Sequence, residues 1–246
     1  MHSIAGHLRI PVIALALTLL IVSAAAPLAL AQSGGSSPRM PGVFQPEVGA
    51  GTVYEMSSAQ APKSAMTYAI VGKEAFEGKE AWWIELRFDL GEEGEMIMKQ
   101  LAFIPPEGVP EPKRMIMQAG ESPPMEFPPE MVASIGRRAR TEMDKAGLGE
   151  KVGTESITVP AGTFRCDHYR QTTGDWTGEV WVSRDVRPNG MVKMVSPEGS
   201  MTLVKVLSNE TSRIKGAPQR MPAMPGGFPG GAPPMEPPAP RAGGTE

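Results

Sequence analysis

The chain has 246 residues, with 24 lysines and arginines against 27 aspartates and glutamates, and its formal net charge is −3. This weakly acidic balance argues against a nucleic-acid partner, because such a partner requires a basic field. Cys166 is the only cysteine, so no intramolecular disulfide can form. We expect its thiol to be buried in a strand, since reactivity needs exposure and a positive neighbourhood.

The first 31 residues have the features of a secretory signal peptide. Arg9 gives a weakly positive start, an apolar run covers 10–26, and residues 29–31 read Ala-Leu-Ala, a small-x-small cleavage site. The run is long enough to span a bilayer, but Pro27 and the cleavage site favour removal. We therefore predict a signal peptide at 1–31, a periplasmic or secreted protein, and no membrane span after cleavage.

Two further segments have compositions that do not favour a packed core. Residues 32–47 are rich in Gly, Ser and Pro, which predicts a flexible lead-in. Residues 213–246 are rich in Pro, Gly and Met without periodicity, which predicts a disordered tail. The remaining residues, 48–212, are a normal size for one domain with a single core.

Most of this domain has the period-2 pattern of β-strands. In the clearest case, over 80–90, Trp82 and Ile84 begin an apolar set that alternates with Trp83, Glu85 and Arg87. Such alternation predicts one buried face and one face in water. Asn189-Gly190 is a hairpin signal between two later strands. Strands are predicted at 51–56, 66–71, 80–90, 95–104, 113–118, 151–159, 163–171, 178–186, 190–196 and 200–208.

One helix is predicted among these strands, over 129–146. Pro129 suits its first turn, Glu130 suits the positive end of its dipole, and Gly147 suits its C-cap. Its predicted apolar stripe includes Met131, Val132, Ile135, Ala139 and Met143. Its arginines at 137, 138 and 140 lie off that stripe, where they either face solvent or meet anionic headgroups or a partner.

These elements predict an α+β fold that is mainly β: a curved antiparallel sheet, or half-barrel, packed on one helix, with disordered termini. A strongly curved sheet needs apolar cover on its concave face, and the helix can provide it.

A short stretch carries a resemblance to known proteins. Residues 158–166 read Thr-Val-Pro-Ala-Gly-Thr-Phe-Arg-Cys, and Val-Trp-Val-Ser follows at 180–183 and Gly-Met-Val-Lys at 190–193. Together these segments resemble secreted bacterial domains of unknown function that form half-barrels similar to periplasmic lipoprotein carriers. The resemblance implies a curved sheet around an apolar cavity for acyl chains. It implies no catalytic residues.

The side chains that carry common enzyme chemistry are few. Outside the signal, His168 is the only histidine. Zinc takes three or four ligands, and Cys166 and His168 supply two on one strand face. They lie nearly 7 Å apart along that strand, too far for direct proton transfer in a nucleophile–base pair. We therefore predict no enzyme activity, no metal site and no cofactor.

The leading functional hypothesis is a non-enzymatic domain whose concave face binds an apolar or amphipathic ligand, such as a lipid, or an envelope protein. The residues predicted to line that face are Trp82, Ile84, Leu86, Phe88, Met131 and Ile135. One alternative is a Cu(I)-binding periplasmic protein, because thioethers are soft ligands and methionines occur in pairs at 96/98, 115/117 and 191/194. Another is an envelope scaffold whose Pro-rich tail contacts partners.

Overall fold

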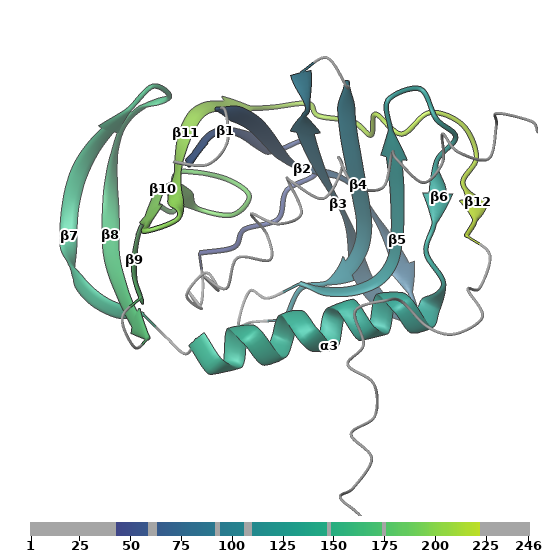
Figure 1. The fold of residues 1–246 in the computed structure, drawn as a ribbon, viewed down its shortest axis with the longest axis horizontal. Coiled ribbons are helices and arrows are strands. Elements are labelled where there is room, and N and C mark those ends of the chain that lie inside the picture. The colour runs from purple at the N-terminus through teal and green to yellow at the C-terminus, as the bar shows by residue number, and fades with distance from the viewer. Residues whose placement is uncertain are drawn as a thin grey trace, which may run out of the picture.

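The computed structural model describes residues 43–58, 63–91, 94–105, 110–146, 149–173 and 176–221 (Figure 1). The predicted signal, most of the predicted lead-in and most of the predicted tail lie outside these residues. The described residues continue to Met221, beyond the boundary predicted at 212.

The described residues form one twelve-stranded sheet and one helix, which confirms the predicted fold class. All neighbouring strands are antiparallel except β6 and β12, which are parallel. The elements are β1 (Gly51–Ser58), β2 (Ser64–Phe76), β3 (Lys79–Asp89), β4 (Glu95–Phe103), β5 (Glu111–Ala119), β6 (Met125–Glu126), α3 (Pro129–Ala146), β7 (Glu150–Val159), β8 (Gly162–Thr173), β9 (Trp176–Val182), β10 (Met191–Ser196), β11 (Gly199–Leu207) and β12 (Gln219–Arg220).

The path of the chain explains how the sheet is assembled. Strands β1 to β6 run in order from the middle of the sheet toward one edge, and α3 then leads to β7 at the opposite edge. Strands β7 to β11 return to the middle, where β11 pairs with β1. In Figure 1 the helix runs below the curled sheet from one side to the other. Its 18 residues are about 27 Å long at 1.5 Å per residue, so the sheet must curl to bring its edges within that reach.

The inner face of the curl is covered by the chain that precedes β1. This segment, drawn in purple in Figure 1, runs inside the curl. Val43 packs with Val180 and Val182 of β9, whereas Phe44 packs in a different cluster with Ile70 and Ile84. The predicted lead-in therefore ends in residues that belong to the core. They give the concave face part of its apolar cover, a role that was predicted for the helix.

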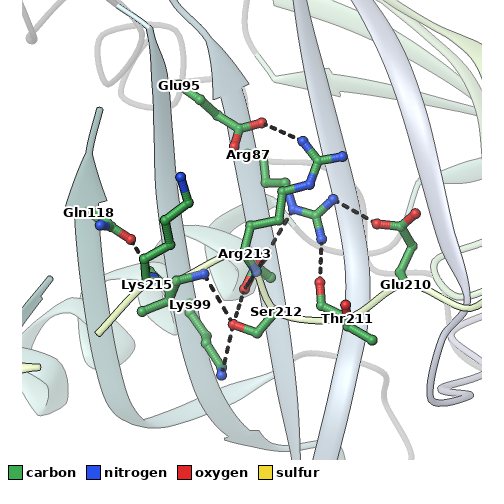
Figure 2. Close-up of polar contacts among 11 residues, drawn as sticks. Arg87, Glu95, Lys99, Gln118, Glu210, Thr211, Ser212, Arg213 and Lys215 are labelled. Carbon is green, nitrogen blue, oxygen red and sulfur yellow. Dashed lines mark hydrogen bonds and ion pairs between the residues drawn. The ribbon is translucent and has the colours of Figure 1, made fainter. Parts of the chain in front are cut away.

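The outer face carries a second covering segment, residues 208–221, which we call the strap. Its first part is joined to the start of the domain, because the N–H of Glu210 donates to the carbonyl of Gly49 at 2.9 Å. Its end forms β12, which pairs with β6. The strap crosses the outer face between these points and contacts β3, β4 and β5 (Figure 2).

Glu85 and Arg87 lie beneath the strap. Their side chains are 0% and 1% exposed, and Arg87 Nε donates to Glu85 Oε1 at 2.8 Å. Arg87 Nη1 contacts Glu210 Oε2 at 2.7 Å, and Nη2 donates to the carbonyl of Thr211 at 3.0 Å (Figure 2). Burial acts to lower the pKa of Arg87, but its hydrogen bonds with Glu85 and Glu210 outweigh burial and raise the pKa. The charged guanidinium thus joins β3 to the strap.

The other oxygen of Glu85 extends this connection. Ser212 Oγ donates to Glu85 Oε2 at 2.7 Å, and the N–H of Arg213 donates to Glu85 Oε1 at 3.0 Å. Farther along the strap, the N–H of Lys215 donates to Gln118 Oε1 of β5 at 2.9 Å. The strap is therefore held mainly by polar groups of the sheet.

The strap corrects one prediction about β3. Trp82 and Ile84 do share the apolar inner face with Leu86, as predicted. The opposite face was predicted to lie in water, but only its end at Asp89 is exposed, while Glu85 and Arg87 are buried. The reason is that a segment more than 120 residues away in sequence returns to satisfy both charges.

The helix has the predicted bounds but not the predicted buried stripe. Val132 is 1% exposed and faces the sheet, whereas Ile135 is 38% exposed. One turn beyond Val132, a Cβ added at Gly136 would lie 3.1 Å from Pro112 Cγ of β5. This close approach places the buried side of α3 on Val132 and Gly136, and a side chain at 136 would require Pro112 to shift by a few tenths of an ångström.

The predicted Asn189-Gly190 hairpin is also corrected. Strand β9 ends at Val182, and residues 183–190 form a loop before β10. The hydroxyl of Tyr54 lies 2.8 Å from Asn189 Oδ1 and 3.0 Å from the carbonyl of Met191, so this loop is held by the centre of the sheet. Pro188 has no N–H to give to a strand ladder, which explains why pairing does not continue through the loop.

Replacing Arg87 with methionine tests the role of the buried ion pair. Because the change leaves Glu85 charged without its cation in a dry site, we expect Arg87→Met to lower the free energy of unfolding by about 3–5 kcal/mol. Arg138→Met, at an exposed helix position, is the control and should change it by less than about 0.5 kcal/mol. Urea denaturation measures both values. Equal stabilities would contradict the role of Arg87 as an anchor for the strap.

Docking of the segment before β1 can be tested at Gly190. A Cβ at Gly190 would lie 1.8 Å from Val43 Cγ1, and its φ is +73°. Gly78 has the same φ of +73°, but a Cβ added there would have nothing within 4 Å, so this position isolates the backbone strain. We expect Gly78→Ala to destabilise by about 1–2 kcal/mol and Gly190→Ala by about 1–3 kcal/mol more. A Val43→Ala change should recover part of that difference, whereas equal losses at the two glycines would show that Val43 is not seated there.

Candidate functional site: a groove beside the helix

A groove of about 690 Å³ opens between α3, β5 and the turn that joins β2 to β3. Its walls combine apolar and charged side chains. They are Phe76, Glu77, Pro110, Glu111, Pro112, Lys113, Arg114, Glu126, Pro129, Val132, Ala133, Gly136, Arg137 and Arg140. Its volume lies within the usual range of about 300–1,000 Å³ for small-molecule sites.

The apolar part of the groove follows from how α3 meets β5. Val132 and Gly136 turn toward Pro112, and Ala133 and Pro129 continue the same wall along the helix. These side chains are short or rigid, so they leave an open channel rather than filling it. A linear apolar chain would bury its surface there without requiring long side chains to rearrange.

The charged part of the groove is mixed, with four cations, Lys113, Arg114, Arg137 and Arg140, and three carboxylates, Glu77, Glu111 and Glu126. Arg114 lies 2.7 Å from Glu126 and 3.9 Å from Glu74, and Arg140 pairs with Glu111. Within the described residues, Arg137 has no ion-pair partner. Among the ion pairs of the described residues the Arg137 guanidinium is thus left over, and such a group can bind a carboxylate or phosphate oxygen.

The predicted ligand-lining residues are only partly brought together. Trp82, Ile84, Leu86 and Phe88 do lie in one row on the inner face of β3. Ile84 is 0% exposed, and Trp82 and Phe44 pack against its cluster, so that part of the row is filled. Met131 and Ile135 lie on α3, and no described hydrophobic cluster joins them to the row.

The sequence analysis therefore did not locate the groove. No sequence-based prediction concerned Pro110 or Pro112, and the arginines at 137 and 140 were expected to face solvent or to meet anionic headgroups or a partner. A signal was available in the helix itself, because positions 129, 133, 136, 137 and 140 fall on one side of an α-helix and combine small residues with two arginines. The sequence did not reveal which strand faces this side of the helix.

Cys166 and His168, the candidate metal pair, have different surroundings. Cys166 is fully buried in a hydrophobic cluster, and burial together with nearby carboxylates raises the pKa of its thiol to about 11. His168 stacks on Trp181 with ring centroids 4.3 Å apart, and its Nδ1 lies 3.2 Å from Glu155 Oε1. Within the described residues, no group of three His, Cys, Asp or Glu side chains is placed to hold a metal ion.

Comparisons with known proteins add a general likeness in fold. No protein-family profile and no curated protein matches the chain. The chain is similar to the solved structure of a candidate lipoprotein from Parabacteroides distasonis (13% identity, TM-score 0.35, covering 68% of this chain and 98% of that one). It is also similar to a candidate exported protein with a YmcC-like fold from Bacteroides fragilis (13%, 0.33, 66% and 97%).

A third solved structure is MucB in complex with MucA(peri), with 8% identity and a TM-score of 0.39 over 70% of this chain and 54% of that one. All three TM-scores lie below 0.5, so these likenesses say nothing further about ligands or partners. In the described part of the chain, no helix is both long and apolar enough to cross a membrane.

The reactivity of the Cys166 thiol tests how tightly the residues around β8 are packed. Raising its pKa from 9.0 to about 11 lowers the thiolate fraction at pH 8 about a hundredfold, and burial blocks access as well. We expect iodoacetamide to modify the native protein at least a hundredfold more slowly than the urea-unfolded protein, as followed by mass spectrometry.

The matched control for this reaction is Ser156→Cys in a Cys166→Ala background, since position 156 is exposed on β7. This control thiol should react at similar rates in the native and unfolded states. Fast labelling of native Cys166 would instead show that the cluster around it opens readily.

Proposed function

We propose that this protein is an exported, non-enzymatic binding module, and that the groove beside α3 takes an amphipathic anion, meaning an apolar chain with a carboxylate or phosphate headgroup. The single observation that carries this proposal is one open groove of about 690 Å³ that combines an apolar wall with Arg137, which has no ion-pair partner among the described residues. Export is inferred from the signal-like residues 1–31.

The chemistry of the groove favours this ligand over a fully polar one. Each buried methylene of a chain contributes about 0.8 kcal/mol, and the wall formed by Pro112, Val132 and Ala133 can cover several of them. A guanidinium adds directed hydrogen bonds to an anionic group. Two of the three carboxylates that line the groove, Glu111 and Glu126, are already paired with Arg140 and Arg114, so they repel an anion less than isolated carboxylates would.

The groove replaces the inner face of β3 as the site that we favour. A ligand over Ile84 would have to displace Phe44, whereas the groove is open. The absence of enzymatic activity remains our proposal, supported by the separate surroundings of Cys166 and His168. The scaffold hypothesis concerns the tail, most of which lies outside the described residues.

Oleate is a suitable first probe because it combines one carboxylate with one apolar chain. We expect Ala133→Trp, which fills the groove from an exposed helix position, to weaken oleate binding at least tenfold in isothermal titration calorimetry below the critical micelle concentration. Ser134→Trp adds the same ring at a neighbouring exposed position that does not line the groove, and its affinity should equal that of the native chain.

A variant of Arg137 tests whether the anionic headgroup contributes to binding in addition to the apolar chain. Arg137→Gln should weaken oleate binding several-fold and should leave the binding of oleyl alcohol unchanged, since only oleate has a charge to lose. No measurable binding of oleate or of an anionic phospholipid to the native chain would reject the proposal. Equal binding by the Ala133→Trp and native chains would reject the groove as its location.

A further inference from the structure

The strap ends beside one wall of the groove. Its last strand, β12, pairs with β6 so that Arg220 lies opposite Glu126, and the N–H of Met221 donates to the carbonyl of Glu126 at 2.9 Å. Glu126 is itself one of the residues that line the groove. The described part of the chain therefore ends about one strand spacing, roughly 5 Å, from a lining residue.

The pairing of β12 also sets the direction in which the chain leaves the strap. β6 and β12 are parallel, and in Figure 1 they lie side by side above the start of α3. Beyond β6, two residues lead to Pro129, which begins the helix and lines the groove. Because parallel strands run in the same direction, the chain leaves Met221 on a course toward the first turn of α3.

The residues that follow Met221 are long enough to reach across the groove. From Pro129 to Arg137 the helix rises about 12 Å, at 1.5 Å per residue. Phe228 is seven residues beyond Met221, and seven extended residues span up to roughly 23 Å. Phe228 can therefore reach the helix wall of the groove while the strap stays on the sheet.

The sequence beyond the strap has the chemistry that the groove accepts. We call residues 222–236 the distal segment. It contains Phe228, two methionines and five prolines, and its only charged side chain is Glu236. It thus combines apolar side chains with one carboxylate. A proline has its backbone φ already fixed, so it loses less conformational freedom on docking than other residues do.

We propose that the distal segment occupies the groove as an internal competitor, with Phe228 against the wall of Val132 and Ala133 and with Glu236 beside Arg137. Tethering gives such a segment an effective concentration on the order of millimolar, so a weak contact is enough for occupancy. The regulatory part of this inference rests on the proposed function, because an external amphipathic anion then has to displace the segment in order to bind.

Photo-crosslinking of the full chain tests where the distal segment lies. Benzoylphenylalanine in place of Phe228 should crosslink to the α3 peptide that contains Val132 and Ala133, as mapped by mass spectrometry. Ala133→Trp, which fills the groove, should reduce the yield at least tenfold. Ser134→Trp adds the same ring outside the groove and should leave the yield unchanged.

Three crosslinking results would overturn the proposal. They are the absence of a crosslink to α3, a yield that Ala133→Trp does not change, and a crosslink that forms only between two chains and rises with protein concentration. The last result would identify a second copy of the chain as the occupant of the groove.

Oleate affinity tests whether the distal segment competes with a ligand. A double variant of Phe228→Ser and Glu236→Gln removes both anchors and should strengthen oleate binding at least threefold in isothermal titration calorimetry, because the competitor is weaker. The matched control, Pro240→Ser with Glu246→Gln, makes the same kinds of change beyond the segment and should keep the native affinity. Equal affinities of the two double variants would overturn the regulatory role.

The failure of this inference and the failure of the proposed function are distinguishable. If Phe228 crosslinks to α3 but oleate does not bind to either double variant, the groove holds only the chain's own segment and the proposed function is rejected. If oleate binds and Ala133→Trp weakens its binding, but no crosslink forms, the proposed function stands and the internal competitor is rejected.

Discussion

The ion pair between Glu85 and Arg87 is the interaction on which the assembly of this fold depends. Two adjacent charges of one strand face are fully buried, and such a pair is stable only if the remaining hydrogen-bonding groups are also satisfied. Glu210, Thr211 and Ser212 of the strap provide those partners. The sheet and the strap thus stabilise each other. Without the strap, the buried charges would lack hydrogen-bond partners. Without the charges, the strap would lose the polar contacts that hold it on β3.

The two faces of the sheet are covered by different segments of the chain. A curved sheet exposes two faces, and a single helix of 18 residues that contacts β5 cannot cover either of them completely. Val43 and Phe44 cover part of the inner face, and the strap covers part of the outer face. These two segments flank the sheet in sequence and meet where Glu210 binds Gly49. The second layer of the fold is therefore made largely of extended chain.

Because these two segments cover parts of the two faces of the sheet, α3 can lie beside β5 and form one wall of the groove. Because Phe44 takes the inner-face position near Ile84, the helix is not needed there and runs beside β5 instead. Gly136 allows it to come close to Pro112, and the side of the helix next to that contact carries Arg137 and Arg140.

The sequence by itself determined most of the strands, the helix and the mainly β fold class, because alternation over 80–90 and the Pro129-Glu130 start are local signals. The two-residue strands β6 and β12 were not predicted. It also placed Trp82 and Ile84 correctly on one face. It could not determine that Glu85 and Arg87 are buried, since a charge on a strand reads as solvated until a partner distant in sequence is known. Only the tertiary structure decided where the helix lies and where a groove opens, because each depends on register and on contacts between residues far apart in the chain.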